Sequence, residues 1–269
     1  MNLTERLKKI ASLVSQGSII ADIGTDHGYL PAYLLKKGIV KKAILSDVSK
    51  GSLEKGRTWM QKNNLTEKAE FRLGSGINIL NENEVDEIII AGMGGILISE
   101  ILEGKKEILN SVKKIILQPM QNPEILRKYL YKNRYEFISE HLVKEDFRIY
   151  EIIVVRLKEE NIIEEKTNEK EPNKSNILDK NIANENKILK NKNISKGIIE
   201  VDDIFYEIGK DLIDKKDLLL AEFIQKKIKN YEAILDNIKN ISGEKIEIKR
   251  NDCIRKIKTM EEILENLKS

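Results

Sequence analysis

A short apolar segment followed by a turn with two glycines is the feature that most restricts the fold of this chain. Residues 18–21 are apolar and partly β-branched, which predicts a buried strand. Gly24 and Gly28 follow in a turn, and a helical pattern then runs from Pro31 to about Gly38. Glycines permit a sharp turn close to a ligand, and the N-terminus of the next helix offers unpaired N–H groups. The arrangement predicts a nucleotide-cofactor site, with a strand–helix turn that binds nothing as the alternative.

A second predicted strand ends in an acidic residue. It covers residues 42–47 and places Asp47 at its tip. A carboxylate about 20 residues beyond the glycine turn can bind both hydroxyls of an adenosine ribose. NAD enzymes and S-adenosylmethionine (SAM) enzymes both use such an acid, so Asp47 indicates adenosine without selecting the cofactor. The alternative is that Asp47 caps a helix that begins near Ser49.

Strands and helices then alternate, which indicates an α/β fold with a parallel sheet. The further predicted strands are residues 67–73, 85–91 and 113–117, and the predicted helices are residues 49–63, 96–109 and 123–131. Before them, apolar residues at helical spacing in residues 3–14 predict an amphipathic helix that packs on the sheet. We expect the fourth strand to end at Gly92 and the fifth at Gln118.

The end of this region departs from the alternation. Residues 135–143 and 148–157 are predicted strands joined by only four residues. A parallel crossover needs a dozen or more residues, so these two strands must be antiparallel. An α/β sheet closed by such a hairpin is the arrangement of class I SAM-dependent methyltransferases, whereas a dehydrogenase more often adds another helix–strand unit. We therefore predict one such domain over residues 1–157.

Two further segments follow this domain. Residues 158–201 are rich in Glu, Lys and Asn and show no sustained apolar period, which predicts a flexible low-complexity insert. Over residues 202–269 apolar residues recur every three or four positions in two runs separated at Ser242 and Gly243. Two amphipathic helices joined by a turn predict an antiparallel coiled-coil hairpin. The charged residues on the surface of this hairpin either only face solvent or contact an RNA, and the sequence leaves both interpretations open.

Composition argues against several classes of protein. The formal net charge of +3 is too small to indicate a nucleic-acid binder by itself. Cys253 is the single cysteine, and the two histidines cannot build a conventional metal site with it, so we expect neither disulfide nor metal. The start of the chain does not resemble a signal peptide, and the apolar run at residues 88–98 is shorter than the roughly 20 residues that span a bilayer. We expect a cytoplasmic monomer without a membrane partner.

Three motifs at the ends of the first, fourth and fifth strands resemble those of the bacterial tRNA (adenine-22) N1-methyltransferases. They are residues 22–31 (Asp-Ile-Gly-Thr-Asp-His-Gly-Tyr-Leu-Pro), 91–95 (Ala-Gly-Met-Gly-Gly) and 116–119 (Ile-Leu-Gln-Pro). The match covers residues 1–157 in order, and the segment 202–269 is similar to that family's C-terminal coiled coil. The resemblance implies SAM as the methyl donor and tRNA as the acceptor.

The resemblance also implies a set of cofactor-binding residues. They are Asp22, Gly24, Gly28, Asp47, Ser75, Gly76, Gly92 and Met93. Residues 22–28 match the acid-x-Gly-x-Gly-x-Gly turn of class I methyltransferases, with Asp26 in place of the middle glycine. Ser75 stands where many SAM enzymes have an acid near the adenine, so a backbone N–H group is expected to take over part of that recognition.

The implied reaction needs placement more than acid–base chemistry. N1 of a neutral adenine has a free lone pair, so its attack on a methyl sulfonium requires no earlier deprotonation. N1 lies on the Watson–Crick edge, so a paired base must first be exposed or flipped. We predict that Tyr29 stacks on this base and that Asp26 or Gln118 accepts from its N6 amino group. His27 is a further catalytic candidate, with a turn residue bonded to the backbone as its alternative, and Asp26 alternatively caps the next helix.

Two other classes of function stay open. A dinucleotide-dependent oxidoreductase would also use Gly24 and Asp47, but the chain offers no evident acid or base for a nicotinamide, and the strand hairpin fits such a fold poorly. A non-enzymatic adaptor for tRNA or the ribosome on a methyltransferase scaffold is the other alternative. Absence of SAM binding would favour the adaptor.

Overall fold

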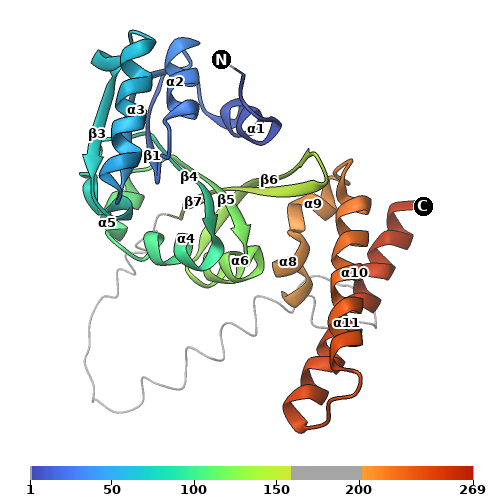
Figure 1. Ribbon diagram of the computed structural model, residues 1–269. Coiled ribbons are helices and arrows are strands. Elements are labelled where there is room, and N and C mark those ends of the chain that lie inside the picture. Colours follow the sequence, from blue (N-terminus) through green and yellow to red (C-terminus); the bar gives the residue numbers. More distant parts are fainter. Residues whose placement is uncertain (1, 159–201, 269) are drawn as a thin grey trace, which may run out of the picture. The chain divides into compact units, whose positions relative to one another are not determined.

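The computed structural model describes residues 2–158 and 202–268. Its strands are β1 (Ser18–Ile23), β2 (Val40–Asp47), β3 (Ala69–Leu73), β4 (Glu87–Gly94), β5 (Lys114–Gln121), β6 (Tyr135–Glu145) and β7 (Arg148–Leu157). They form one sheet in the order β3-β2-β1-β4-β5-β7-β6 (Figure 1). The first five strands are parallel, and β7 is antiparallel to both β5 and β6. The predicted parallel sheet with a terminal antiparallel hairpin is confirmed.

Helices cover both faces of this sheet. They are α1 (Glu5–Leu13), α2 (Tyr29–Lys36), α3 (Lys50–Lys62), α4 (Gly95–Leu102), α5 (Lys106–Asn110) and α6 (Pro123–Lys132). Buried side chains of α1, α2 and α3 pack in one hydrophobic core, and those of α4, α5 and α6 pack in another. Side chains in the middle of β4 contribute to both cores. Ile89 lies in the core with α1, α2 and α3, and Ile88 and Ile90 lie in the core with α4, α5 and α6. This two-sided burial explains the continuous apolar sequence of the strand.

Two predicted strand ends are wrong, as is one predicted helix. β4 continues through Gly92 to Gly94 and β5 continues to Gln121, because their pairing persists beyond Ala91 through two irregular steps in the register. The predicted helix over residues 96–109 is divided into α4 and α5. The chain turns at Gly104, where an added Cβ would lie 2.9 Å from Oδ1 of Asn78.

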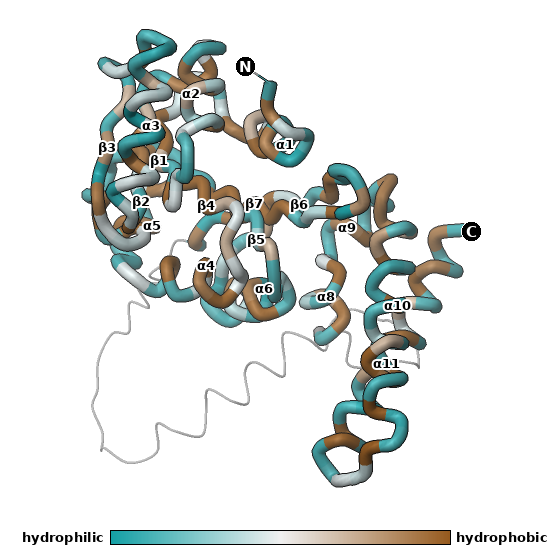
Figure 2. Tube along the Cα trace, viewed as in Figure 1, coloured by the Kyte–Doolittle hydropathy of each residue, from teal (hydrophilic) through white to brown (hydrophobic). Residues whose placement is uncertain are grey.

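The C-terminal part of the described chain is helical. It comprises α8 (Asp202–Ile208), α9 (Lys210–Asp214), α10 (Leu220–Ile238) and α11 (Glu244–Lys268). The predicted break at Ser242 and Gly243 is confirmed, and α10 and α11 lie side by side as a helical hairpin with alternating apolar and polar bands (Figure 2). The continuous helical period expected before this break is interrupted at Gly209, whose φ of +81° belongs to the left-handed region.

Other boundaries differ from expectation or stay untested. The second helix of the hairpin begins at Glu244, well before the apolar run that starts at Ile254, and so includes Ile246 and Ile248. The predicted insert at 158–201 lies outside the described residues, apart from Lys158. Residues 2–158 and 204–268 belong to one compact unit, and the three-part domain division and the coiled-coil geometry stay predictions.

A buried ionic cluster joins the sheet to the C-terminal helices. Arg127 of α6 is fully buried and donates from Nε to Glu140 of β6 at 2.7 Å. Its Nη1 lies 2.7 Å from a carboxylate oxygen of Glu151 and donates to the backbone carbonyl of Tyr206 in α8 at 3.1 Å. Asp211 of α9 accepts from the backbone N–H of Glu140 at 2.7 Å. The guanidinium of Arg127 thus connects its own helix, α6, to β6, β7 and α8.

Within the two described ranges, no helix is long and apolar enough to cross a membrane.

Candidate active site

A cavity of about 310 Å³ lies at the carboxyl ends of β1 and β4. Its wall consists of Arg6, Leu7, Asp22, Gly24, Thr25, Asp26, His27, Gly28, Tyr29, Leu30, Ala91, Gly92 and Met93. We call this cavity the turn pocket. The structure therefore brings together most of the residues singled out in the sequence. Asp47, Ser75, Gly76 and Gln118 do not line the turn pocket.

The turn after β1 is held against β2 by its backbone. The N–H groups of Gly24 and Thr25 both donate to the carbonyl of Ser46, at 2.7 and 2.9 Å. Gly24 and Gly28 have φ angles of +77° and +67°, which side chains seldom tolerate. A Cβ on Gly28 would also lie 3.0 Å from Leu45. Both glycines are therefore needed for the shape of the pocket.

Asp22 is a buried acid in the wall of this pocket, with 8% of its surface exposed. Burial raises the pKa of its carboxyl to about 6, while the nearby hydroxyl of Thr25 opposes this rise and the charge of Asp47 adds to it. No basic side chain of the described residues forms an ion pair with Asp22. A cationic ligand in the pocket would supply the missing positive charge.

Asp47 lies at the end of β2 and is not the cap of the following helix. Ser49 caps α3 by accepting from the N–H of Ser52, so the alternative interpretation of Asp47 as the cap is wrong. One carboxylate oxygen of Asp47 accepts from the N–H of Ser49 at 2.7 Å. Ser75 and Gly76 follow β3, which pairs with β2, and the N–H of Gly74 donates to the carbonyl of Asp47 at 3.1 Å. These residues share the carboxyl edge of the sheet, beside the turn pocket.

Asp26, His27 and Tyr29 form a linked array at the pocket wall. A carboxylate oxygen of Asp26 lies 2.6 Å from Nδ1 of His27. The imidazole stacks on Tyr29 with ring centroids 5.1 Å apart and an interplanar angle of 7°, and Trp59 meets Tyr29 edge-on. Gly28 is the N-cap residue of α2, and no side chain caps this helix. The alternative in which Asp26 caps the helix is therefore wrong.

Gln118 is fully buried, and its amide is already engaged. Its Oε1 accepts from Nη1 of Arg6 at 2.5 Å and from the N–H of Gly92 at 3.2 Å, while Nε2 donates to the carbonyl of Pro119. The oxygen that we expected to accept from an adenine amino group thus already has two donors. In this arrangement Gln118 positions Arg6 and Gly92.

Arg6 is a site residue that the sequence analysis missed. Its backbone N–H donates to Glu145 at 3.0 Å, and its guanidinium lies 5.4 Å from the ring of Tyr150. These contacts fix the first turn of α1 beside the pocket. The apolar spacing of residues 3–14 predicts the helix, but it carries no signal that one polar side chain reaches the carboxyl end of β5.

The side chain of Met93 covers the glycine turn. A Cβ on Gly24 would lie 1.9 Å from Cε of Met93, so the thioether occupies the space directly over this turn. Methionine has flexible, unbranched torsions and changes rotamer readily. A ligand that lies against Gly24 must displace this methyl group.

The strand order, the glycine turn after β1, the acid after β2 and the closing antiparallel hairpin define a Rossmann-like methyltransferase fold. Residues 3–153 match the family model described as methyltransferase domain, and the chain belongs to this family. The sheet and the candidate site of this chain both lie almost wholly within residues 3–153.

Two relatives of this chain are named as tRNA methyltransferases or putative tRNA methyltransferases. The chain is 36% identical over 154 residues to the tRNA (adenine(22)-N(1))-methyltransferase of Bacillus subtilis, a match that covers 57% of this chain and 65% of that protein. It is 32% identical over 157 residues to a putative tRNA methyltransferase of Mycoplasma genitalium, of which the match covers 69%. The aligned region thus spans somewhat less than two thirds of the first relative's length.

Solved structures extend the similarity to the C-terminal helices. The B. subtilis tRNA methyltransferase TrmK is 26% identical, with a TM-score of 0.76, and the alignment covers 98% of this chain and 99% of that one. A putative tRNA methyltransferase of Streptococcus pneumoniae in complex with SAM is 27% identical, with a TM-score of 0.73 over 98% and 100% of the two chains. Among the described residues of the present chain, no group of His, Cys, Asp and Glu is placed to hold a metal ion.

Proposed function

We propose that this protein is an enzyme that methylates N1 of the adenine at position 22 of tRNA, with SAM as the methyl donor. The observation that carries the proposal is the array of Asp26, His27 and Tyr29, which shares one pocket with the glycine turn of a methyltransferase fold. The B. subtilis relative with this named activity supports the choice of acceptor. We also infer that the protein acts as a monomer in the cytoplasm and needs no metal.

The residues present fit the proposed cofactor. SAM carries an ammonium and a sulfonium, and the buried carboxylate of Asp22 offers a negative charge without a basic partner among the described residues. A ligand can lie against the backbone of Gly24 when the side chain of Met93 moves aside, and Asp47 has a second carboxylate oxygen for ribose hydroxyls. When bound, SAM supplies an electrophilic methyl group.

The acceptor side of the pocket fits a purine. Tyr29 is 43% exposed and lies beside His27, so the two rings present an aromatic surface to a flipped base. The Asp26 carboxylate is exposed, and a negative charge near N6 would stabilise the cationic N1-methyl product. With the nucleophile already unprotonated, these residues orient the base and balance its charge.

The decisive experiment is mass spectrometry of nucleosides after incubation of the protein with unmodified tRNA and labelled SAM. We expect labelled N1-methyladenosine, and no product from the same tRNA with guanine at position 22. Binding of tRNA without binding of S-adenosylhomocysteine would favour the adaptor on a methyltransferase scaffold. Binding of NAD instead would favour the oxidoreductase.

We predict that Asp47→Ala weakens S-adenosylhomocysteine binding by about 1.5–3 kcal/mol, the range for hydrogen bonds to a charged group. The physical reason is loss of the carboxylate that bonds the ribose hydroxyls. Isothermal titration calorimetry measures the effect, with Glu67→Ala in the exposed turn before β3 as the matched control. Equal affinity in Asp47→Ala and the wild type would remove Asp47 from the ribose.

A second prediction follows from the pKa of Asp22, which burial raises from 3.8 to about 6. Below this pH the free protein holds Asp22 neutral, and above it the carboxylate attracts the ammonium of the cofactor. The affinity for S-adenosylhomocysteine should therefore rise about tenfold between about pH 5 and pH 7. Calorimetry across this range measures it, and Asp22→Asn should give a flat profile. A wild-type affinity independent of pH would contradict the assignment.

A further inference from the structure

A second cavity, of about 750 Å³, lies where the β6–β7 turn meets α10. Residues from three segments line it: 119–123 at the end of β5, 147–151 at the start of β7, and 223–230 on α10. We call it the hairpin groove. It has no part in the proposed cofactor site.

The hairpin groove opens at the same edge of the sheet as the turn pocket. Leu117 of β5 pairs with Ile153 of the antiparallel β7, so the beginning of β7 lies beside the carboxyl end of β5. Arg6 joins the two cavities, because it lines the turn pocket while its guanidinium lies 5.4 Å from the ring of Tyr150 in the groove wall. The side chain of Arg6 therefore lies between the two cavities, and a ligand that occupied both would have to pass it.

The charge of the groove wall is mainly positive. Its charged residues are Arg148, Lys226, Lys227, Lys229 and Glu151. Glu151 is buried against Arg127, Lys226 pairs with Glu222, and Lys227 pairs with Glu207. Arg148 and Lys229 are exposed, and neither forms an ion pair within the part of the chain that the structure describes. Two cations are therefore free to meet an anion.

Phe147 places an aromatic ring at the rim of the same groove. Its surface is 75% exposed, and the guanidinium of Arg148 lies 5.4 Å from the ring. The turn that carries it is anchored on both sides, because Lys226 donates to the carbonyl of Phe147 at 2.8 Å and Arg6 donates to Glu145 at 3.0 Å. An exposed aromatic ring on an anchored turn, beside cations without an ion pair, is a surface on which nucleic-acid bases can stack.

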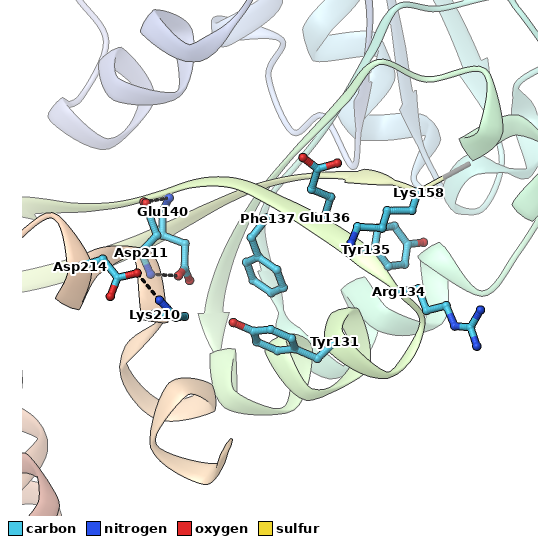
Figure 3. A pocket seen from close by; sticks show the side chains of 10 residues that line it. All are labelled: Tyr131, Arg134, Tyr135, Glu136, Phe137, Glu140, Lys158, Lys210, Asp211 and Asp214. Carbon is cyan, nitrogen blue, oxygen red and sulfur yellow. Dashed lines mark hydrogen bonds and ion pairs between the residues drawn. The ribbon is translucent and has the colours of Figure 1, made fainter. Parts of the chain in front are cut away.

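Another cavity, of about 560 Å³ between α6, β6 and α9, offers a contrast (Figure 3). There Lys210 pairs with Asp214, and Asp211 bonds to the backbone of Glu140. Tyr131 stacks on Phe137 with ring centroids 4.4 Å apart. The wall also contains Arg134 and Lys158, which form no ion pair within the described residues, but its four acidic residues outnumber its three cations. Only the hairpin groove combines unpaired cations with a free ring among the cavities described here.

We propose that the hairpin groove binds the RNA strand that carries the target adenine. Arg148 and Lys229 bind its phosphates, and Phe147 stacks on a base next to the one that enters the turn pocket. The inference rests on the proposed function, because the acceptor must be an RNA whose adenine has left its stack. An acidic peptide would satisfy the two cations but would leave the ring of Phe147 without a partner.

The first test removes the two unpaired cations. In the double variant Arg148→Gln/Lys229→Gln, the slope of log affinity for tRNA against log salt should fall by about 1.4, since each phosphate contact to a single strand contributes about 0.7. Fluorescence anisotropy at several salt concentrations measures the slope. The matched control is Lys62→Gln/Lys68→Gln, two exposed lysines just before β3 at the opposite edge of the sheet. The control should keep the wild-type slope.

The second test concerns the ring. Phe147→Ala should lower kcat/KM for tRNA about tenfold, equivalent to about 1.4 kcal/mol, while Phe147→Trp should keep the wild-type value. Affinity for S-adenosylhomocysteine and the melting temperature should stay unchanged, because Phe147 is exposed and outside the turn pocket. A wild-type slope in the cation variant, or a wild-type kcat/KM in Phe147→Ala, overturns the assignment.

The two proposals fail in different ways. If the wild type binds tRNA and the cation variant shows the expected change in salt slope, but the wild type produces no methylated adenine, the proposed function fails. The groove then stands as an RNA-binding site. If the wild type methylates adenine but the groove variants bind and react as the wild type does, the groove fails alone. Absence of any tRNA binding by the wild type overturns the groove as an RNA site and leaves a partner of another class.

Discussion

Replacement of Arg127 by methionine is expected to lower the free energy of unfolding by about 3–5 kcal/mol, the range for breaking a buried ion pair. Arg127 is fully buried, and Glu140 and Glu151 are 1% and 7% exposed. Burial by itself would lower the pKa of Arg127, but the charges of Glu151 and Glu140 outweigh it and raise the pKa. Arg127→Met therefore leaves two carboxylates inside the protein without a counter-charge. Equilibrium unfolding in urea, followed by circular dichroism, measures the loss.

The control is removal of the whole cluster. Arg127→Met/Glu140→Leu/Glu151→Leu replaces the three charges by apolar side chains of similar size, which is often neutral or stabilising in buried ion clusters. We expect this triple variant to regain most of the stability that Arg127→Met loses. A triple variant as unstable as the single one would show that the hydrogen bond to Tyr206 and the local packing, and not uncompensated charge, cause the loss.

The succession of strands and helices, and the antiparallel hairpin at its end, were predictable because they depend on local patterns. Apolar segments such as residues 85–91 and the short link between β6 and β7 carry their information within a few residues. The interruption at Gly209 was not predictable in this way. An added Cβ there would lie 2.5 Å from the carboxylate of Glu140, so the break depends on a contact with a strand that is distant in sequence.

In the candidate site, too, the residues placed by nearby sequence were predictable, whereas contacts between residues far apart in the chain were not. The glycine turn and Asp47 follow from spacing along the chain, and the structure places them as expected at the carboxyl edge of the sheet. The role of Gln118 did not follow, because its oxygen is taken by Arg6, a residue 112 positions away. Asp26 was ambiguous because a carboxylate before a helix can cap it, and only the geometry pairs it with His27.

The pairing of Asp26 and His27 leads to the prediction with the largest effect on catalysis. We expect Asp26→Asn and Tyr29→Ala to act on the acceptor base and to leave S-adenosylhomocysteine affinity within a few fold of the wild type. Each should lower kcat about 10- to 100-fold, since one base–aromatic stack is worth about 1–3 kcal/mol and a hydrogen bond to a charged group about as much. If the two free-energy effects add, the double variant should lose about 100- to 10,000-fold in kcat.

Three measurements on each variant decide whether these residues act on the base: kcat with tRNA, affinity for S-adenosylhomocysteine, and melting temperature. Tyr29→Phe is the matched control, because it keeps the ring against His27 and should retain most of the activity. Asp26→Asn keeps the size of the side chain but removes the charge near N6. Since no side chain caps α2, neither Asp26→Asn nor Tyr29→Ala should melt earlier through loss of a cap. A joint loss of cofactor affinity and thermal stability would assign Asp26 and Tyr29 to the architecture of the turn and not to the acceptor base.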